Sequence, residues 1–221
     1  MGPDRDLIRI PLELSPDERK EARAFRGTDE VLSSQRGDME EERSIRRLNW
    51  GCGAAGVPGW VNSDVKEGPG VDISCDIRDG FPLPDDTFDY IVAIHALPEI
   101  PYDHLGGTLQ ELRRVLKPGG TLRLVLPDLD KGIDAYRRGD RDYFLVPDDA
   151  VERLGSKFAV QMVWFGYSRS LFTRDYIEEL LERAGFSTVE HSAFRETGSG
   201  HSGITELDNR ERESLFVEAV K

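Results

Sequence analysis

The chain has 221 residues and carries 42 acidic against 29 basic side chains, which gives a formal net charge of −13. This length suits a single domain, and so negative a chain is disfavoured as a ligand of the DNA or RNA phosphate backbone. No apolar run of 18 residues is present, so we expect no membrane span. Residues 1–10 lack the apolar segment of a signal peptide, so we expect a cytoplasmic protein. Two cysteines do not make a disulfide framework.

Residues 1–45 are charged and precede the first strand of the predicted core. Residues 7–14 fit a short strand, and Ser15-Pro16-Asp17-Glu18 is a capping box that predicts a short helix. We expect an N-terminal arm that covers the active site or packs on a partner subunit, in a monomer or a homodimer. A loosely ordered tail is the alternative.

The most informative segment follows this arm. Residues 48–53 read as an apolar strand that runs into a glycine turn at Gly51 and Gly53, and Asp64 ends a second short strand. Glycines let the backbone approach a ligand closely, and an acid at the tip of the next strand accepts hydrogen bonds from ribose hydroxyls. The pattern predicts a site for a nucleoside-type cofactor.

A dinucleotide is one candidate for that cofactor, because residues 51–56 form a literal G-x-G-x-x-G. That fingerprint needs a helix on the last glycines and an acid about 20 residues on. Here Asp64 follows Gly51 by only 13 positions, and Pro58 and Gly59 interrupt any long helix. The motif is therefore weak support for NAD(P), and a tight turn without a ligand is a further alternative.

Alternating strands and helices fill the rest of the core. We expect strands over 70–77, 88–95 and 121–126, with a helix over 105–116 that 117–120 (Lys-Pro-Gly-Gly) ends. A helix capped by Thr173 and two closing strands, 186–194 and 214–220, complete the pattern. This order predicts an α/β fold with a mostly parallel sheet.

Two segments outside the predicted core are candidates for substrate selection. Residues 129–172 form a substrate-side insert rich in aromatic side chains, most of which we expect to cover the sheet as core. Residues 195–213 contain three glycines and are long enough for a lid or substrate loop. The arginines at 137, 138 and 141 form a small basic patch, which we interpret as a solvated helix face.

The chain from 48 to 128 resembles the class I S-adenosylmethionine-dependent methyltransferases, in particular their type 11 small-molecule branch. The resemblance rests on residues 48–53 (LNWGCG), 59–64 (GWVNSD), 85–90 (DDTFDY) and 111–120 (ELRRVLKPGG). It implies a Rossmann-like, seven-stranded sheet with an antiparallel last strand and helices on both faces, formed by residues 46–221. It also implies S-adenosyl-L-methionine as the cofactor.

The resemblance implies a role for each matching position. Gly51 and Gly53 would lie under the methionine part of the cofactor, Asp64 would bind the ribose hydroxyls, and Asp76 with Ile77 would meet the adenine. The full set of expected cofactor contacts is Asn49, Gly51, Cys52, Gly53, Asp64, Val65, Asp76, Ile77, Ile94 and His95. Two positions depart from the family pattern: Asn49 replaces an acid, and Glu99 replaces a histidine.

Methyl transfer to oxygen or nitrogen often requires a base, and histidine has a suitable pKa. His95, at the end of the fourth strand, is the first candidate, followed by His201 and Tyr167 and then by Glu99 and His104. His191, inside a predicted strand, is a structural candidate. The acids near the site are too scattered to predict a metal.

The sequence therefore predicts methylation of a small biosynthetic or secondary-metabolite acceptor at oxygen or nitrogen. Two alternatives stay open: a non-catalytic S-adenosylmethionine-binding protein and an NAD(P)-dependent oxidoreductase.

Overall fold

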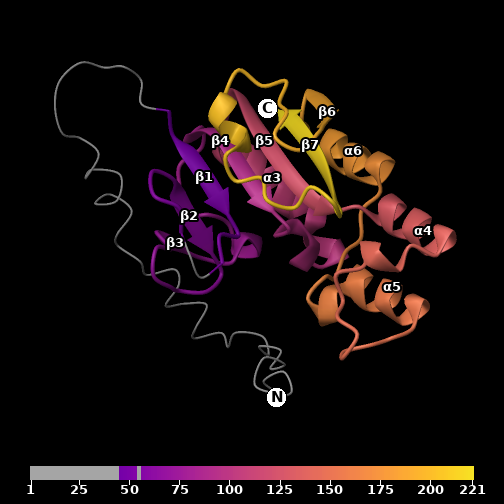
Figure 1. Cartoon of the computed structure of the whole chain (residues 1–221). Coiled ribbons are helices and arrows are strands. Elements are labelled where there is room, and N and C mark those ends of the chain that lie inside the picture. Colours follow the sequence, from indigo (N-terminus) through magenta and orange to yellow (C-terminus); the bar gives the residue numbers. More distant parts are fainter. Residues whose placement is uncertain (1–44, 54–55) are drawn as a thin grey trace. The chain divides into compact units, whose positions relative to one another are not determined.

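The computed structural model describes residues 45–53 and 56–221, and its centre is one seven-stranded sheet (Figure 1). The strand order is β3-β2-β1-β4-β5-β7-β6. The strands are β1 (Arg47–Trp50), β2 (Val61–Asp64), β3 (Ile73–Ser74), β4 (Phe88–Ile94), β5 (Leu116–Pro127), β6 (Thr188–Ser192) and β7 (Ser214–Val220). β7 runs antiparallel to both of its neighbours, and the other pairings in the sheet are parallel. The predicted Rossmann-like fold class is confirmed, whereas the expected arm over 1–45 lies almost wholly outside the described residues.

One face of the sheet carries the main hydrophobic core and two α-helices. Helix α3 (Leu105–Val115) buries Leu105, Leu109 and Leu112 against this face, and α6 (Arg174–Arg183) buries Ile177 and Leu181. Their spacing of three and four residues places these side chains on one side of each helix. Both helices appear where the sequence pattern predicts them.

The junction between α3 and β5 differs from the expectation. The helix ends at Val115, and β5 begins at Leu116 rather than at Thr121, so the Lys-Pro-Gly-Gly segment is an irregular start of the strand. The pairing of β4 with β5 shifts register there, between Phe88 and Tyr90. Pro118 disfavours helical geometry in the residue before it, which explains why the helix cannot continue.

The other face of the sheet has a smaller core built on Tyr90 and Val92. Trp60, in the connection from β1 to β2, packs edge-to-face on Tyr90 with ring centroids 5.4 Å apart. Ile204, in the short 3-10 helix η7 (Ser202–Thr205), is completely buried in the same cluster. Segments that connect the strands therefore pack on this face and cover part of it.

A buried arginine holds the connection between β6 and β7 in place. Arg123, in the middle of β5, has no exposed surface and donates hydrogen bonds to the carboxylates of Asp208 and Glu218. It also bonds the Ser192 hydroxyl and the carbonyl oxygens of residues 193 and 196. The segment that we expected to form a lid or substrate loop, 195–213, is thus anchored to the sheet at Glu196 and Asp208.

The insert between β5 and α6 forms a small core of its own. Helices α4 (Leu129–Arg138) and α5 (Leu154–Val163) lie side by side (Figure 1), and Tyr143, Phe144 and Phe158 pack between them. Of the insert's aromatic side chains, Phe172 is the one in the main core, so the expectation that most of them cover the sheet is wrong. An isolated parallel bridge between Asp128 and Phe172 brings the two ends of the insert together.

Six short 3-10 helices complete the described structure. Besides η7 they are η2 (Ile77–Asp79), η3 (Leu97–Glu99), η4 (Tyr102–His104), η5 (Arg141–Tyr143) and η6 (Trp164–Gly166). Among the described helices, none is long and apolar enough to cross a membrane.

Candidate cofactor and acceptor site

The glycine turn lies at the carboxyl end of β1, between the ends of β2 and β4. Gly51 and Gly53 have φ of 72° and 65°, the left-handed region that glycine adopts without strain. The amides of Gly51 and Cys52 both donate to the carbonyl oxygen of Ser63, at 2.8 and 3.1 Å. A Cβ on Gly51 would sit 2.3 Å from the Cβ of Ala96, just after β4, whereas one on Gly53 would meet no atom within 4 Å. The turn is therefore closed on one side and open above Gly53.

Asp64 ends β2 beside this turn, with its carboxylate held by backbone amides. One oxygen accepts from the Gly53 amide at 2.9 Å, and the other accepts from the Lys66 amide at 3.1 Å. Each carboxylate oxygen has two lone pairs, so each keeps capacity for a further donor. The side chain is thus oriented and able to accept two adjacent hydroxyl groups. Val65 beside it is half exposed, at 49%.

The described residues of the connection from β1 to β2, 51–53 and 56–60, contain no helix, whereas a dinucleotide site would need one. The amide of Trp60 bonds the carbonyl of Val57, and β2 begins at the next residue. A Cβ on Gly56 would lie 1.8 Å from the carbonyl oxygen of Gly70, so this turn packs directly on the β2–β3 connection. Without a long helix here, a pyrophosphate lacks its usual binding site, which argues against the NAD(P) alternative.

The side chain of Asn49 supports the connection from β1 to β2 through Asn62. Its side chain is buried and donates from Nδ2 to Oδ1 of Asn62, at 3.1 Å. Asn62 in turn bonds the backbone of Val57 and Trp60 and the carboxylate of Asp72. The structure thus gives Asn49 a clear supporting contact, and its contact with a cofactor stays a prediction.

The two residues expected at the adenine have different surroundings. Asp76 caps η2 and forms several hydrogen bonds with Arg78. Burial acts to raise the pKa of Asp76, but the bonds from Arg78 outweigh it and the pKa lies below its ordinary value. Ile77 is almost completely buried in the main core. Val65, which is exposed beside Asp64, is the better placed of the predicted apolar contacts.

His95 follows β4 directly but is held away from solvent. Its backbone has φ of 56°, its amide bonds the carbonyl of Val125, and its ring Nε2 lies 2.8 Å from the hydroxyl of Ser214 on β7. Burial, and to a smaller extent the charge of Arg210, lower the pKa of His95 to about 3. A histidine with this pKa is neutral at pH 7 and a weak base. The arrangement favours a structural role for His95 at the end of β4.

The other two predicted catalytic residues lie apart from His95. The His201 ring packs on Tyr90, with centroids 5.1 Å apart. Tyr90 pairs with Arg47 at the start of β1, so His201 is near the amino ends of the parallel strands, opposite the glycine turn. Tyr167 is half exposed in the segment after η6. The structure does not bring these three side chains into one cluster.

Glu99 is an exposed ionisable side chain after β4 that lies within electrostatic range of Asp64. It ends η3, and its electrostatic neighbours are Asp64, Lys66 and Arg169. Desolvation of the carboxylate, followed by the negative charge of Asp64, raises the pKa of Glu99, although the residue as a whole is exposed. From the sequence alone Glu99 ranks behind His95, because its position is a departure from the family pattern.

An apolar segment is tied to the same 3-10 helix. The amides of Arg169 and Ser170 donate to the carbonyl of Pro98, at 2.7 and 3.1 Å, and the Ser170 hydroxyl bonds the carbonyl of Ile100. The segment just before this contact exposes Val163 (44%), Trp164 (37%), Phe165 (50%) and Tyr167 (48%), and Leu171 (38%) follows it. The turn that presents these side chains is tight, because Trp164 and Phe165 have positive φ. A large apolar surface is thereby held beside Glu99.

Neither a basic patch nor a metal cluster is added by the insert. Arg141 bonds Asp148 and the carbonyl of Glu152, and Arg138 lies 3.9 Å from Asp140. These contacts partly neutralise the arginines that the sequence shows close together. Within residues 45–53 and 56–221, no three His, Cys, Asp or Glu side chains are grouped so as to hold a metal ion.

Comparison with known proteins gives a consistent result. A family model described as a methyltransferase domain matches residues 7–191. Demethylmenaquinone methyltransferase of Lysinibacillus sphaericus is 32% identical over 114 residues, which are 51% of this chain and 47% of that protein. The tRNA N(3)-cytidine methyltransferase METTL2 of Gallus gallus is 27% identical over 117 residues, or 53% of this chain and 28% of that protein.

Solved structures agree in fold. A protein of Pyrococcus horikoshii OT3 matches with a TM-score of 0.50 and 17% identity, covering 93% of this chain and 92% of its own. The chain spans about half the length, or less, of the curated relatives named above.

Proposed function

Since the chain belongs to the methyltransferase-domain family, we propose that it is an S-adenosylmethionine-dependent methyltransferase whose acceptor is a small molecule methylated at oxygen or nitrogen. The observation that carries this proposal is the apolar segment 163–171, fastened to Pro98 and Ile100 beside Glu99 and Asp64. Small-molecule sites are lined mainly by apolar and aromatic side chains with a few polar groups. Segment 163–171 together with Glu99 has this composition.

The residues around the glycine turn fit the cofactor. The open space above Gly53 would admit the methionine part, the free lone pairs of Asp64 would accept the ribose hydroxyls, and exposed Val65 would lie against the nucleoside. When bound, S-adenosylmethionine supplies an electrophilic methyl group on a sulfonium centre. The protein's own contribution is to position the acceptor and to take up its proton.

Glu99 is the side chain that we propose as the proton acceptor. The pKa of Glu99 is raised above that of a solvated glutamate and so lies closer to neutral pH, which suits a general base. His95, with a pKa of about 3, would instead fix the end of β4 through Ser214. His201 and Tyr167 remain predictions: the first would act only on a ligand at the opposite end of the sheet, and the second belongs to the acceptor surface.

Two further features support a small acceptor. A net charge of −13 disfavours RNA, and two arginines of the insert, Arg138 and Arg141, have acidic partners. The name of the relative from Lysinibacillus sphaericus refers to a small-molecule acceptor, whereas that of the Gallus gallus relative refers to tRNA. The first relative is the more similar, which agrees with the charge argument.

Calorimetric titration with S-adenosylhomocysteine tests the cofactor site. Asp64→Asn keeps the side-chain volume but removes the charge that favours hydrogen bonds from the ribose hydroxyls, so affinity should fall about tenfold or more. Asp142→Asn, an exposed aspartate of the insert, is the matched control and should bind as the wild type does. Equal affinity in all three proteins would contradict the proposed role of Asp64.

Transfer of a labelled methyl group then tests the acceptor class. Wild-type protein is incubated with panels of phenols, hydroxy acids and amines and, separately, with unmodified tRNA. We expect label in at least one small molecule, and loss of transfer without loss of S-adenosylhomocysteine binding in Glu99→Gln. Label in tRNA alone would overturn the proposal, and binding without any transfer would favour the non-catalytic alternative.

A further inference from the structure

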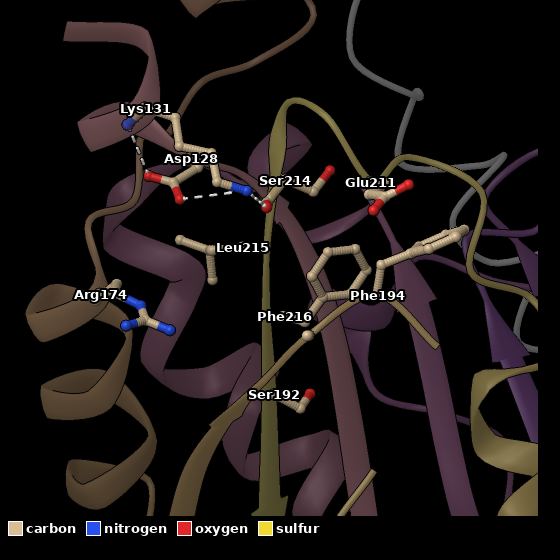
Figure 2. A pocket seen from close by; sticks show the side chains of 10 residues that line it. Asp128, Lys131, Arg174, Ser192, Phe194, Glu211, Ser214, Leu215 and Phe216 are labelled. Atoms are coloured by element: carbon tan, nitrogen blue, oxygen red, sulfur yellow. Dashed lines mark hydrogen bonds and ion pairs between the residues drawn. The ribbon is translucent and has the colours of Figure 1, made fainter. Parts of the chain in front are cut away.

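A pocket outside the predicted cofactor site opens where β5 ends and β7 begins. Its volume is about 460 Å³, within the range of small-molecule sites. Figure 2 shows its walls: Asp128 and Lys131 on one side, Arg174 and Leu215 on another, and Phe194, Phe216 and Glu211 opposite. Ligands of open α/β sheets bind at this carboxyl edge, so the position suits a binding site.

Two of the four charged side chains in the pocket neutralise each other. A carboxylate oxygen of Asp128 accepts from the Lys131 amide at 3.1 Å and caps α4. The Lys131 ammonium lies 4.0 Å from the other carboxylate oxygen and donates to the carbonyl of Ser214. This pair is therefore occupied by contacts within the protein.

The other two charges are available to a ligand. Arg174 and Glu211 are both exposed, and within the described part of the chain neither side chain has a hydrogen bond or ion pair with another residue. They lie at opposite sides of the pocket, with Phe194 and Phe216 on the side of Glu211 (Figure 2). The two phenylalanine rings pack edge-to-face with centroids 6.0 Å apart, and Phe216 is almost fully buried, so this wall is firm and apolar.

The geometry points to a second ligand site, which takes a small dipolar molecule with a carboxylate at Arg174, an apolar or aromatic middle on Phe194 and Phe216, and a cationic amine at Glu211. This site is separate from the acceptor surface at 163–171 and does not depend on it. The pocket wall includes Ser214, which is completely buried and whose hydroxyl is 2.8 Å from Nε2 of His95, so a bound ligand would perturb His95 through this residue. Occupancy should therefore be visible in the NMR signals of the His95 ring.

Three ligands of nearly the same shape test the assignment: 4-(aminomethyl)benzoate, 4-methylbenzoate and 4-methylbenzylamine. Each is titrated into the full chain while amide and histidine ring signals are followed by NMR. We expect the dipolar compound to bind about fivefold more tightly than either singly charged one, since an exposed ion pair contributes up to about that factor. The shifts should centre on Ser192, Phe194, Ser214 and the His95 ring.

Variants separate the two charges. Arg174→Gln should reduce the affinity for 4-(aminomethyl)benzoate to that for 4-methylbenzylamine, and Glu211→Gln should reduce it to that for 4-methylbenzoate. Arg183→Gln, on the same helix α6 but paired with Glu179, is the control and should bind as the wild type does.

Equal affinity of the three compounds, no binding at all, or binding unchanged in Arg174→Gln would each overturn the site. S-adenosylhomocysteine affinity, measured in the same variants, should stay at the wild-type value. The outcome for the pocket is therefore independent of whether the proposed acceptor class is correct.

Discussion

Replacing Arg123 by methionine is the most informative test of how this fold is held together. The change removes a fully buried guanidinium that donates six hydrogen bonds. It leaves the carboxylates of Asp208, with no exposed side-chain surface, and Glu218, with 6%, without their cation. Asp208 keeps the amide of Arg195 as a donor, and Glu218 keeps Thr197 and Gly198.

The expected loss follows from these contacts. Removing one member of a buried ionic network typically costs about 3–5 kcal/mol, because the partner charges stay buried without compensation. This network has one cation and two carboxylates, so the retained donors cannot balance the charge and we expect the upper half of that range. A domain is stable by only about 5–15 kcal/mol, so the variant should be close to unfolding at 37 °C.

Urea denaturation followed by circular dichroism measures the effect. With a slope of about 2 kcal/mol/M, the midpoint of Arg123→Met should fall by about 2 M. Arg183→Met, an exposed arginine on α6, is the control and should shift the midpoint by less than about 0.3 M. Limited proteolysis should cut Arg123→Met first within residues 193–208, which the guanidinium anchors.

A decrease of the urea midpoint of Arg123→Met by less than about 0.5 M, with an unchanged slope, would refute the expected stabilisation by Arg123. So would equal proteolysis of the 193–208 segment in the variant and the wild type. The triple variant Arg123→Met/Asp208→Leu/Glu218→Leu separates the loss of hydrogen bonds from the burial of unpaired charges. If the unpaired carboxylates cause the loss of stability, replacing them should restore part of it.

Three further predictions concern the site. Gly51→Ala should abolish S-adenosylhomocysteine binding in calorimetry, because its Cβ would lie 2.3 Å from that of Ala96, whereas Gly53→Ala should cost only about 1–2 kcal/mol of backbone strain; equal effects would contradict the close approach. His95 has a pKa of about 3 when folded and of about 6.5 when unfolded, so its contribution to stability is complete above pH 6.5 and is lost as the pH falls toward 3. Between pH 7.5 and 5.5 this costs about 1.4 kcal/mol, and a urea midpoint in His95→Asn as pH-sensitive as in the wild type would refute it. Phe165→Ser should raise the acceptor KM while leaving thermal stability and S-adenosylhomocysteine affinity unchanged, since half of the side chain is already exposed; a lowered Tm would mean that it belongs to the core.

Local patterns in the sequence were sufficient for much of the fold. The leucines at 105, 109 and 112 specify a one-sided helix through spacing alone, and the glycines at 51 and 53 mark a turn because few other residues adopt positive φ. Asp64 could also be placed beside that turn, because the strand that it ends is short. The antiparallel last strand and the identity of the cofactor came from the family resemblance and not from these patterns.

Tertiary structure decided what each ionisable side chain can do. Position after β4 made His95 the leading base, but burial in the folded chain and the charge of Arg210, more than 100 residues further on, lower its pKa. Arg123 reads as an interruption in an apolar strand, and only the folded chain supplies its two carboxylates, 85 and 95 residues further on. The insert packs its aromatic side chains on each other because α4 and α5 are side by side, which no spacing within 129–172 indicates. Local sequence determines backbone conformation, whereas charge, burial and contact across the sheet are set by residues that meet only in the folded chain.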